Sequence, residues 1–120
     1  MTLGQKQRLF TRLVGLLIAK AYEMGYELSF GEAYRTKEQA ALYAEAGRGI
    51  SNSLHCSRLA IDLNLFKDGK YLRSTESHRP LGEWWEGLHD LTAWGGNFKD
   101  SQGRPKPDGN HYSVTHGGRA

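Results

Sequence analysis

The sequence contains very little cysteine, and this limits the chemistry open to it. Cys56 is the single cysteine among 120 residues, so no disulfide can form within the chain. A metal site built from several thiolates is excluded for the same reason. Histidine, aspartate and glutamate are therefore the ligand types that remain for any metal centre.

Long apolar runs are absent as well. No stretch of the sequence approaches the roughly 18 consecutive apolar residues that mark a transmembrane helix. Residues 1–8 lack the apolar segment and the small-residue cleavage site of a signal peptide. We therefore expect no stable membrane insertion, and a protein that remains in the cytoplasm where it is made unless something releases it.

Clusters of lysine and arginine interleaved with aromatic residues, which mark many nucleic-acid-binding surfaces, do not occur either, so we expect no nucleic-acid partner. The formal net charge is +3, and residues 1–24 contain four basic residues against one acidic residue. This early excess has two interpretations. A solvated helix face is the simpler one, and attraction to an anionic polymer or surface is the alternative.

What is present describes a single folded domain. Hydrophobic residues make up 38% of the chain and charged residues 24%, which is ordinary for a globular protein. Repeats and linkers are not visible, and a chain of this length can bury a real core. We therefore expect one domain over residues 1–120, and a monomer.

Hydrophobic periodicity predicts three helices. Apolar residues recur at three- and four-residue spacing over residues 4–24, and Gly25 is expected to end this first helix. Residues 36–39 match a capping box and begin a second helix that ends at Gly47. Pro80 is expected to begin the third. Trp84 and Trp85 are adjacent in this helix and cannot both point fully inward, so one of them could line a cleft. The expected buried stripe comprises Leu81, Trp84, Trp85, Leu88 and Leu91.

Alternating apolar and polar residues predict short strands around these helices. The clearest is residues 59–65, in which every second residue is leucine or isoleucine and Asp62 faces away from the core. A turn signal at residues 67–70 predicts a hairpin that returns through Tyr71 and Leu72. Further strands are expected at residues 27–34 and 111–115, and loops at residues 47–54, 95–96 and 105–109. The sum is a small α+β domain with a mostly antiparallel sheet flanked by about three helices.

His55 and Asp62 are the first candidates for chemistry. They lie seven positions apart, so on one straight strand their side chains would face opposite sides. We therefore place His55 in the loop before the strand, with Asp62 turned toward it. His111, on the last expected strand, could face Asp62 across the sheet. Three such ligands leave a fourth position for water, as in a catalytic zinc site, and Asp108 could accept the proton of that water.

Each of these residues also has a plainer interpretation. A single histidine more often fills the surface or the core than binds a metal. Asp62 could simply mark the solvent face of an edge strand, and Asp108, which precedes a glycine, is an ordinary turn residue. His116 is the nearest substitute if His111 is not a ligand, and His78 could lie on the rim of the cleft.

Two short motifs strengthen the metal interpretation. Residues 53–62, SLHCSRLAID, resemble the S-x-H-x-x-G-x-A-x-D signature of the D-Ala-D-Ala carboxypeptidase and dipeptidase family of zinc peptidases, the VanX-like group. Asp108-x-x-His111 resembles that family's second motif. Residues 31–36 followed by Gln39 resemble its strand-to-helix segment, and residues 94–98 a segment of its short phage endolysin members. The resemblance spans about residues 28–113.

The resemblance assigns roles to individual residues and implies a hedgehog- and DD-peptidase-like fold. Arg58 stands where the signature has glycine, so the local backbone does not transfer directly, and Arg58 could contact substrate or a neighbouring acid. The implied zinc ligands are His55, Asp62 and His111, with Asp108 as the catalytic base, Arg35 as the arginine that steadies the oxyanion, and Ser53 near the substrate.

The resemblance also implies a function. It points to a zinc peptidase that cleaves an amide bond in the peptide stem of bacterial peptidoglycan, with L-Ala-D-Glu expected first and D-Ala-D-Ala second. A short chain without an export signal or a separate wall-binding domain is similar to a phage or prophage endolysin. Such an enzyme waits in the host cytoplasm and reaches the wall after membrane permeabilisation. The alternatives are a bacterial dipeptidase or carboxypeptidase acting on soluble wall fragments, and a zinc-holding wall-binding module without catalysis.

Overall fold

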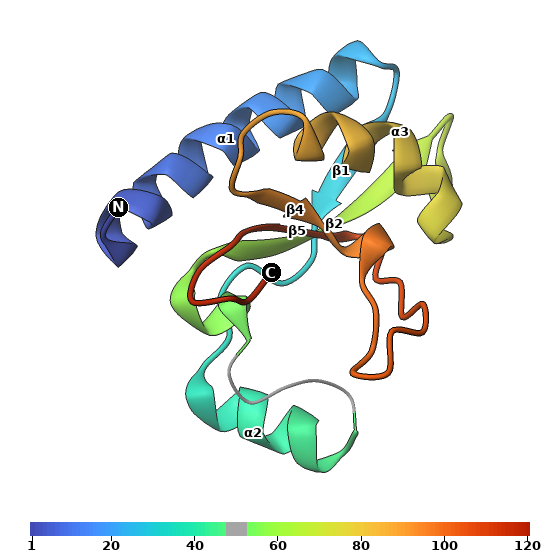
Figure 1. Ribbon diagram of the computed structural model, residues 1–120. Helices are drawn as coiled ribbons and strands as arrows, with labels where there is room; N and C mark the ends of the chain where they lie inside the picture. Colours follow the sequence, from blue (N-terminus) through green and yellow to red (C-terminus); the bar gives the residue numbers. More distant parts are fainter. Residues whose placement is uncertain (48–52) are drawn as a thin grey trace.

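A computed structural model describes residues 1–47 and 53–120, so most of the loop expected at residues 47–54 lies outside the described residues (Figure 1). The described chain forms an α+β fold, as predicted. Its helices are α1 (Leu3–Glu23), α2 (Lys37–Glu45) and α3 (Thr75–Glu86), with short 3₁₀ helices η1 (Leu54–Ser57) and η2 (Gly95–Asn97). Its strands are β1 (Glu27–Phe30), β2 (Ala60–Lys67), β3 (Lys70–Leu72), β4 (Thr92–Trp94) and β5 (His111–Val114).

The sheet is antiparallel throughout, and β2 is its central strand. The strand order is β1-β2-β5-β4, with β3 paired to the end of β2. Helices α1 and α3 lie on one side of the sheet, whereas α2 and the loop before β5 lie on the other (Figure 1). The two faces of β2 therefore meet very different surroundings.

The hydrophobic core fills the space between the sheet and the helices α1 and α3. The alternation predicted for β2 is confirmed, because Leu63 and Leu65 are fully buried while the side chain of Asp62 stays partly exposed. Trp85 of α3 and Tyr112 of β5 meet edge to face in this core, with ring centroids 6.1 Å apart. Core packing thus fixes β2 and β5, the two strands that carry the ligand candidates Asp62 and His111.

Helix α3 begins five residues earlier than predicted. The Ser74 hydroxyl accepts a hydrogen bond from the Ser77 backbone N–H at 3.1 Å, and this cap starts the helix at Thr75. Pro80 consequently lies inside α3, so placing the helix start there was wrong. Proline is favoured in a first turn, but a serine cap decides where that turn lies.

Two further expectations needed correction, and one strand was not predicted. The strand expected at residues 27–34 ends at Phe30, and the three-residue strand β4 was not foreseen because it is too short for an alternating pattern. Trp85 is fully buried, and Trp84 packs beside the core with the Lys20 ammonium 5.9 Å from its ring centroid, so neither tryptophan lines the cleft.

Within the described residues, no helix combines the length and apolarity needed to cross a membrane.

His78 is buried in the interior, so its expected place on the cleft rim was wrong. Its side chain is 2% exposed, and its Nδ1 lies 2.8 Å from the Tyr112 hydroxyl. This contact joins α3 to β5 at the residue next to His111. Burial lowers the pKa of His78 to about 4.

We predict that His78 makes stability depend on pH between about 6.5 and 4. In that window the unfolded chain binds a proton that the folded protein excludes, so the free energy of unfolding falls as the pH falls. The full loss from this group is about 3 kcal/mol, at about 1.4 kcal/mol per pKa unit. Urea unfolding of the wild type and of His78→Gln across this range measures it. Parallel stability curves for the two proteins would contradict the prediction.

Candidate metal centre

His55 lies on η1, just before β2, as its odd spacing from Asp62 predicted. The buried Ser53 caps this short helix, because its hydroxyl accepts a hydrogen bond from the His55 backbone N–H at 3.2 Å. The backbone N–H of Arg35 donates to the carbonyl of His55 at 3.2 Å, which ties η1 to the segment that leads into α2. Ser53 therefore orients a ligand candidate through the backbone, and it also lines the cleft described below.

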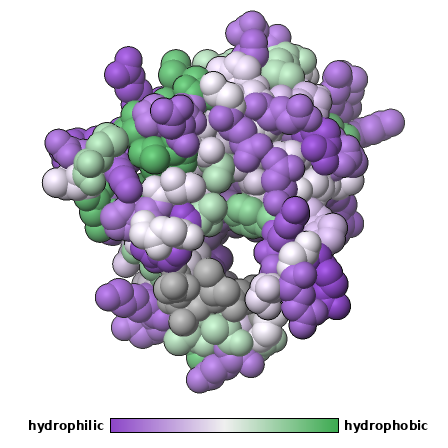
Figure 2. All heavy atoms as spheres, in the orientation of Figure 1, coloured by the Kyte–Doolittle hydropathy of each residue, from purple (hydrophilic) through white to green (hydrophobic). Residues whose placement is uncertain are grey.

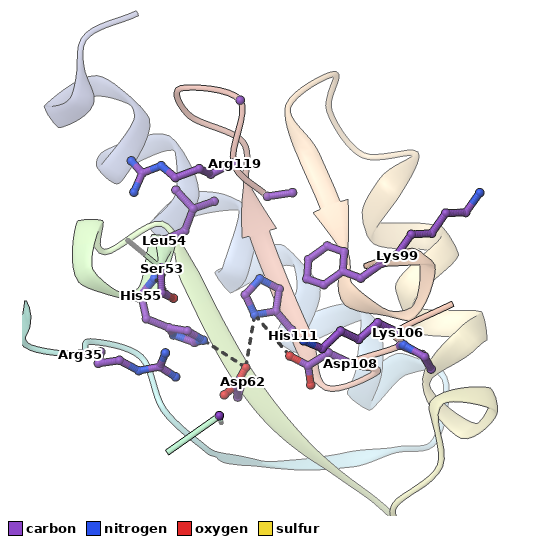
Figure 3. A pocket seen from close by; sticks show the side chains of 15 residues that line it. Arg35, Ser53, Leu54, His55, Asp62, Lys99, Lys106, Asp108, His111 and Arg119 are labelled. Carbon is purple, nitrogen blue, oxygen red and sulfur yellow. Dashed lines mark hydrogen bonds and ion pairs between the residues drawn. The ribbon is translucent and has the colours of Figure 1, made fainter. Parts of the chain in front are cut away.

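Asp62 and His111 are direct partners in the antiparallel pairing of β2 with β5. The expectation that His111 faces Asp62 across the sheet is thus met. Asp62 Oδ1 lies 3.3 Å from His55 Nε2 and 3.6 Å from His111 Nδ1. The three side chains point toward one another, with Asp108 on one side and Arg35 on the other (Figure 3).

This arrangement can hold a metal ion. His55, Asp62 and His111 each offer a ligand atom, and these atoms lie within 4.8 Å of one another. Within the described residues, the buried Oδ1 atom of Asp62 has no hydrogen-bond partner, although such atoms are normally satisfied. Two imidazole nitrogens and one carboxylate oxygen form a donor set that suits zinc. A cation among these atoms would satisfy the orphaned oxygen.

The electrostatics of the cluster favour the charged form of Asp62. Burial alone would raise the pKa of this carboxyl group, but the facing His111 and His55 side chains outweigh that effect and hold its pKa at about 2. For His55, burial lowers the pKa, and the Asp62 carboxylate more than offsets it, so the net direction is upward. Asp62 is therefore ionised at neutral pH, which is the form that binds a cation.

Asp108 and Arg35 flank the three ligand candidates. Asp108 Oδ2 lies 3.9 Å from His111 Nδ1, and its carboxyl group remains half-exposed to the cleft. Partial desolvation raises the pKa of Asp108, and the nearby Asp62 carboxylate adds to this rise, against the opposing charge of His111. The Arg35 guanidinium is held by Glu32 and stacks on Tyr43, with its central carbon 4.9 Å from the ring centroid.

These side chains share one cleft of about 670 Å³. Ligand-binding pockets of proteins typically have this volume. Figure 2 shows the hollow on this face of the molecule. The cleft lining includes all six predicted site residues, Arg35, Ser53, His55, Asp62, Asp108 and His111, together with basic side chains such as Lys99 and Lys106.

The segment of residues 94–98 holds Asp108 and His111 in place, a role that the sequence did not reveal. A Cβ atom on Gly95 would lie 2.1 Å from the Asp108 carbonyl oxygen and 2.9 Å from His111 Cβ, so only glycine fits. The fully buried Trp94 donates its indole N–H to the Gly109 carbonyl at 2.7 Å. The adjacent tryptophan and glycine were the available signal, but only the tertiary contacts explain them.

Arg58 adopts the left-handed backbone conformation, with φ of 56°, at the C-terminal end of η1. This explains why the family signature has glycine at the position, because glycine reaches that region without a steric cost. The Arg58 guanidinium stacks on the Tyr34 ring at 4.0 Å from its centroid, rather than pairing with an acid as one expectation had it.

His116 was the expected replacement if His111 were not a ligand. It lies outside the metal-binding group, with its Nδ1 atom 3.2 Å from Lys6 Nζ.

Comparison with known proteins identifies the fold. The chain matches the L-Ala D-Glu endopeptidase ChiX of Serratia marcescens with a TM-score of 0.66 and 18% identity, over 93% of this chain and 85% of that one. It also matches a mutant of the vancomycin-resistance D,D-pentapeptidase VanY, from a VanB-type cassette and in complex with Zn(II), with a TM-score of 0.57 and 19% identity, over 88% and 70%. No family model matches the sequence, and no curated protein does. The expected DD-peptidase-like fold is thereby confirmed.

We predict that Arg58→Gly is more stable than Arg58→Ala by about 1 kcal/mol, because alanine retains the steric cost of the left-handed conformation. Both variants lose the contact with Tyr34, so their difference isolates the backbone effect. Chemical denaturation measures it. The matched control is exposed Arg12 of α1, where the helix should reverse the order and favour alanine. The same order at both positions would contradict the backbone explanation.

We also predict that Asp62→Asn loses zinc. The amide keeps the size of the side chain but removes the charge that binds the cation. Zinc affinity should fall by more than the roughly 10- to 100-fold that changes outside the ligand shell cost. Competition with a chelator measures it. Asn64→Ala, two residues along the same face of β2, serves as the control and should keep its zinc. Normal metal loading in Asp62→Asn would remove Asp62 from the ligand set.

Proposed function

We propose that this protein is a zinc-dependent peptidase that hydrolyses an amide bond in the peptide stem of bacterial peptidoglycan. The observation that carries the proposal is one cleft in which a His-Asp-His group is flanked by a carboxyl group and a guanidinium. The fold adds support, because it is also that of an L-Ala D-Glu endopeptidase and of a D,D-pentapeptidase in complex with Zn(II).

In this proposal His55, Asp62 and His111 hold the zinc ion. Zinc, when bound, supplies Lewis-acid chemistry, since it polarises a carbonyl group and lowers the pKa of water. The Asp62 carboxylate is ionised and turned toward both imidazoles, so the ligands are preorganised before a metal arrives. Little rearrangement is needed for binding.

Asp108 serves as the general base and then as the general acid. Its carboxyl group lies beside His111 and opens to the cleft, where it can take a proton from the attacking water and return it to the leaving amine. Its raised pKa suits both steps, since a base with a very low pKa would hold the proton too weakly. Arg35, on the opposite side of the ligands, stabilises negative charge on the carbonyl oxygen.

The bond that we propose is L-Ala-D-Glu, with a phage or prophage endolysin as the biological setting. The likeness to the L-Ala D-Glu endopeptidase, which extends over 85% of that chain, supports this bond. In that setting a monomeric enzyme would stay in the host cytoplasm until lysis and then act on the wall. The likeness to the D,D-pentapeptidase supports the second candidate, a dipeptidase or carboxypeptidase acting on soluble wall fragments. A purely zinc-holding wall-binding module would have no need of Asp108 and Arg35.

The deciding experiment is mass spectrometry of the fragments released from purified peptidoglycan, with and without a chelator. We expect new amino-terminal D-Glu, and no release once the metal is removed. Free D-Ala would favour the second candidate. Digestion of soluble stem peptide but not of intact wall would also do so. No release from either substrate would reject the proposal.

We predict that Asp108→Asn retains zinc but loses hydrolysis. The amide cannot accept the proton, and loss of a general base costs about 10²- to 10⁴-fold in rate. Zinc content and the rate of fragment release are measured on the same preparation. Asp100→Asn, in the loop before β5 but outside the cleft lining, is the control and should keep both. Loss of zinc from Asp108→Asn would show that Asp108 is a ligand and not the base.

A further inference from the structure

Glu32 is a carboxylate that the ligand set does not include, yet its backbone is fixed to a ligand. It follows β1 in a segment that continues to pair with β2. The backbone N–H of Asp62 donates to the Glu32 carbonyl at 2.8 Å, and the N–H of Gly31 donates to the Asp62 carbonyl at 2.8 Å. A Cβ atom on Gly31 would lie 2.9 Å from that Asp62 oxygen, so this close approach requires glycine. Glu32 therefore has a defined position relative to the metal cluster.

The side chain of Glu32 reaches Arg35. Its Oε1 atom accepts a hydrogen bond from Arg35 Nε at 2.6 Å and also contacts Arg35 Nη2. Both side chains are largely shielded, with Glu32 27% and Arg35 13% exposed. Charge-assisted hydrogen bonds are stronger than neutral ones, and partial burial limits their screening by salt. Glu32 thus fixes the orientation of the guanidinium that lines the cleft.

The same oxygen also lies near His55. Glu32 Oε1 is 3.8 Å from His55 Nδ1, and the Ala33 carbonyl oxygen is 3.4 Å from that nitrogen. The other ring nitrogen, Nε2, faces Asp62. An acceptor and a negative charge beside Nδ1 favour the tautomer with the proton on Nδ1, which leaves the lone pair of Nε2 for a metal. One carboxylate therefore serves an arginine and a ligand histidine.

We propose that Glu32 is a positioning residue of this site, which holds Arg35 in the cleft and supports His55 as a metal ligand. The proposal rests on the function proposed above. It differs from a role in which Glu32 and Arg35 merely form a stabilising ion pair. That role would leave zinc affinity and turnover unchanged once the variant is folded.

The chain contains a matched control for such a pair. Glu76 and Arg79 in α3 have the same three-residue spacing, with a hydrogen bond of 2.8 Å from Arg79 Nε to Glu76. Glu76 is exposed and Arg79 is partly exposed, and neither residue lines the cleft. Glu76→Gln therefore removes the same charge from the same kind of pair at a distance from the metal cluster.

The experiment compares Glu32→Gln, Glu32→Ala and Glu76→Gln with the wild type. Zinc affinity is measured by competition with a chelator, and kcat and KM are measured separately on peptidoglycan fragments. We expect both Glu32 variants to lose about 10- to 100-fold in zinc affinity, the range found when outer partners of metal ligands are removed. At saturating zinc we expect a lower kcat with little change in KM. Glutamine should retain part of the function, because its amide oxygen still accepts from Arg35, whereas alanine cannot. Glu76→Gln should match the wild type in every measurement.

An Arg35→Ala background separates the two contributions of Glu32. In that background the effect of Glu32→Gln on kcat should largely disappear, since the guanidinium that it positions is gone, while the effect on zinc affinity should persist through His55. Wild-type zinc affinity in both Glu32 variants would overturn the proposal, as would a loss of kcat that is undiminished in the Arg35→Ala background. If the wild-type protein binds zinc but cleaves no wall peptide, the peptidase proposal fails, and zinc affinity alone decides the role of Glu32.

Discussion

The antiparallel pairing of β2 with β5 is the constraint on which the site depends. It sets Asp62 directly opposite His111, and the neighbouring residues of both strands are buried in the core. A shift of one residue in this register would turn every side chain of one strand to the opposite face. Asp62 would then enter the core, and a leucine or isoleucine would enter the cleft. Burial of the apolar face of β2 therefore fixes the register that places Asp62 opposite His111, and the metal cluster depends on it as much as on the ligands themselves.

Two features of the site reduce stability and are retained at or beside the candidate ligands. Asp62 keeps a buried oxygen without a hydrogen-bond partner among the described residues, and Arg58 adopts a backbone conformation that favours glycine. Strain and unsatisfied polar atoms persist only where the surrounding structure fixes them. Here the supporting elements are the Ser53 cap, the segment that leads from β1 to α2, and the core beneath β2. These supporting elements thus supply the stability that keeps the charged cluster in position.

Local patterns predicted part of this structure, and contacts between distant segments account for the rest. The alternation in β2 identified Asp62, and the odd spacing from Asp62 correctly moved His55 off the strand. Pro80 was expected to begin α3, but the cap at Ser74 starts the helix five residues earlier. The connection between Glu32 and His55 could not be predicted, because it crosses 23 positions of sequence and forms only when the segment after β1 pairs with β2.

Asp108 and His111 belong to one rigid unit, and this links proton transfer to metal binding. The His111 backbone N–H donates to the Asp108 carbonyl at 3.1 Å, and the Asp108 N–H donates to the Gly95 carbonyl at 2.8 Å. Trp94 fixes Gly109, which lies between Asp108 and His111 in the sequence. Thr75, at the start of α3, lies so close to Gly109 that a Cβ atom on this glycine would be 2.6 Å from the Thr75 Cα. The Ser74 cap, which starts α3 at Thr75, therefore also places Thr75 against Gly109, the residue that follows the base Asp108. Because these contacts join both residues to the core, a change in the packing of Trp94 must move the base and the ligand together. The distance between them is thus more robust than the position of either one relative to Arg35, which reaches the cleft from a different segment.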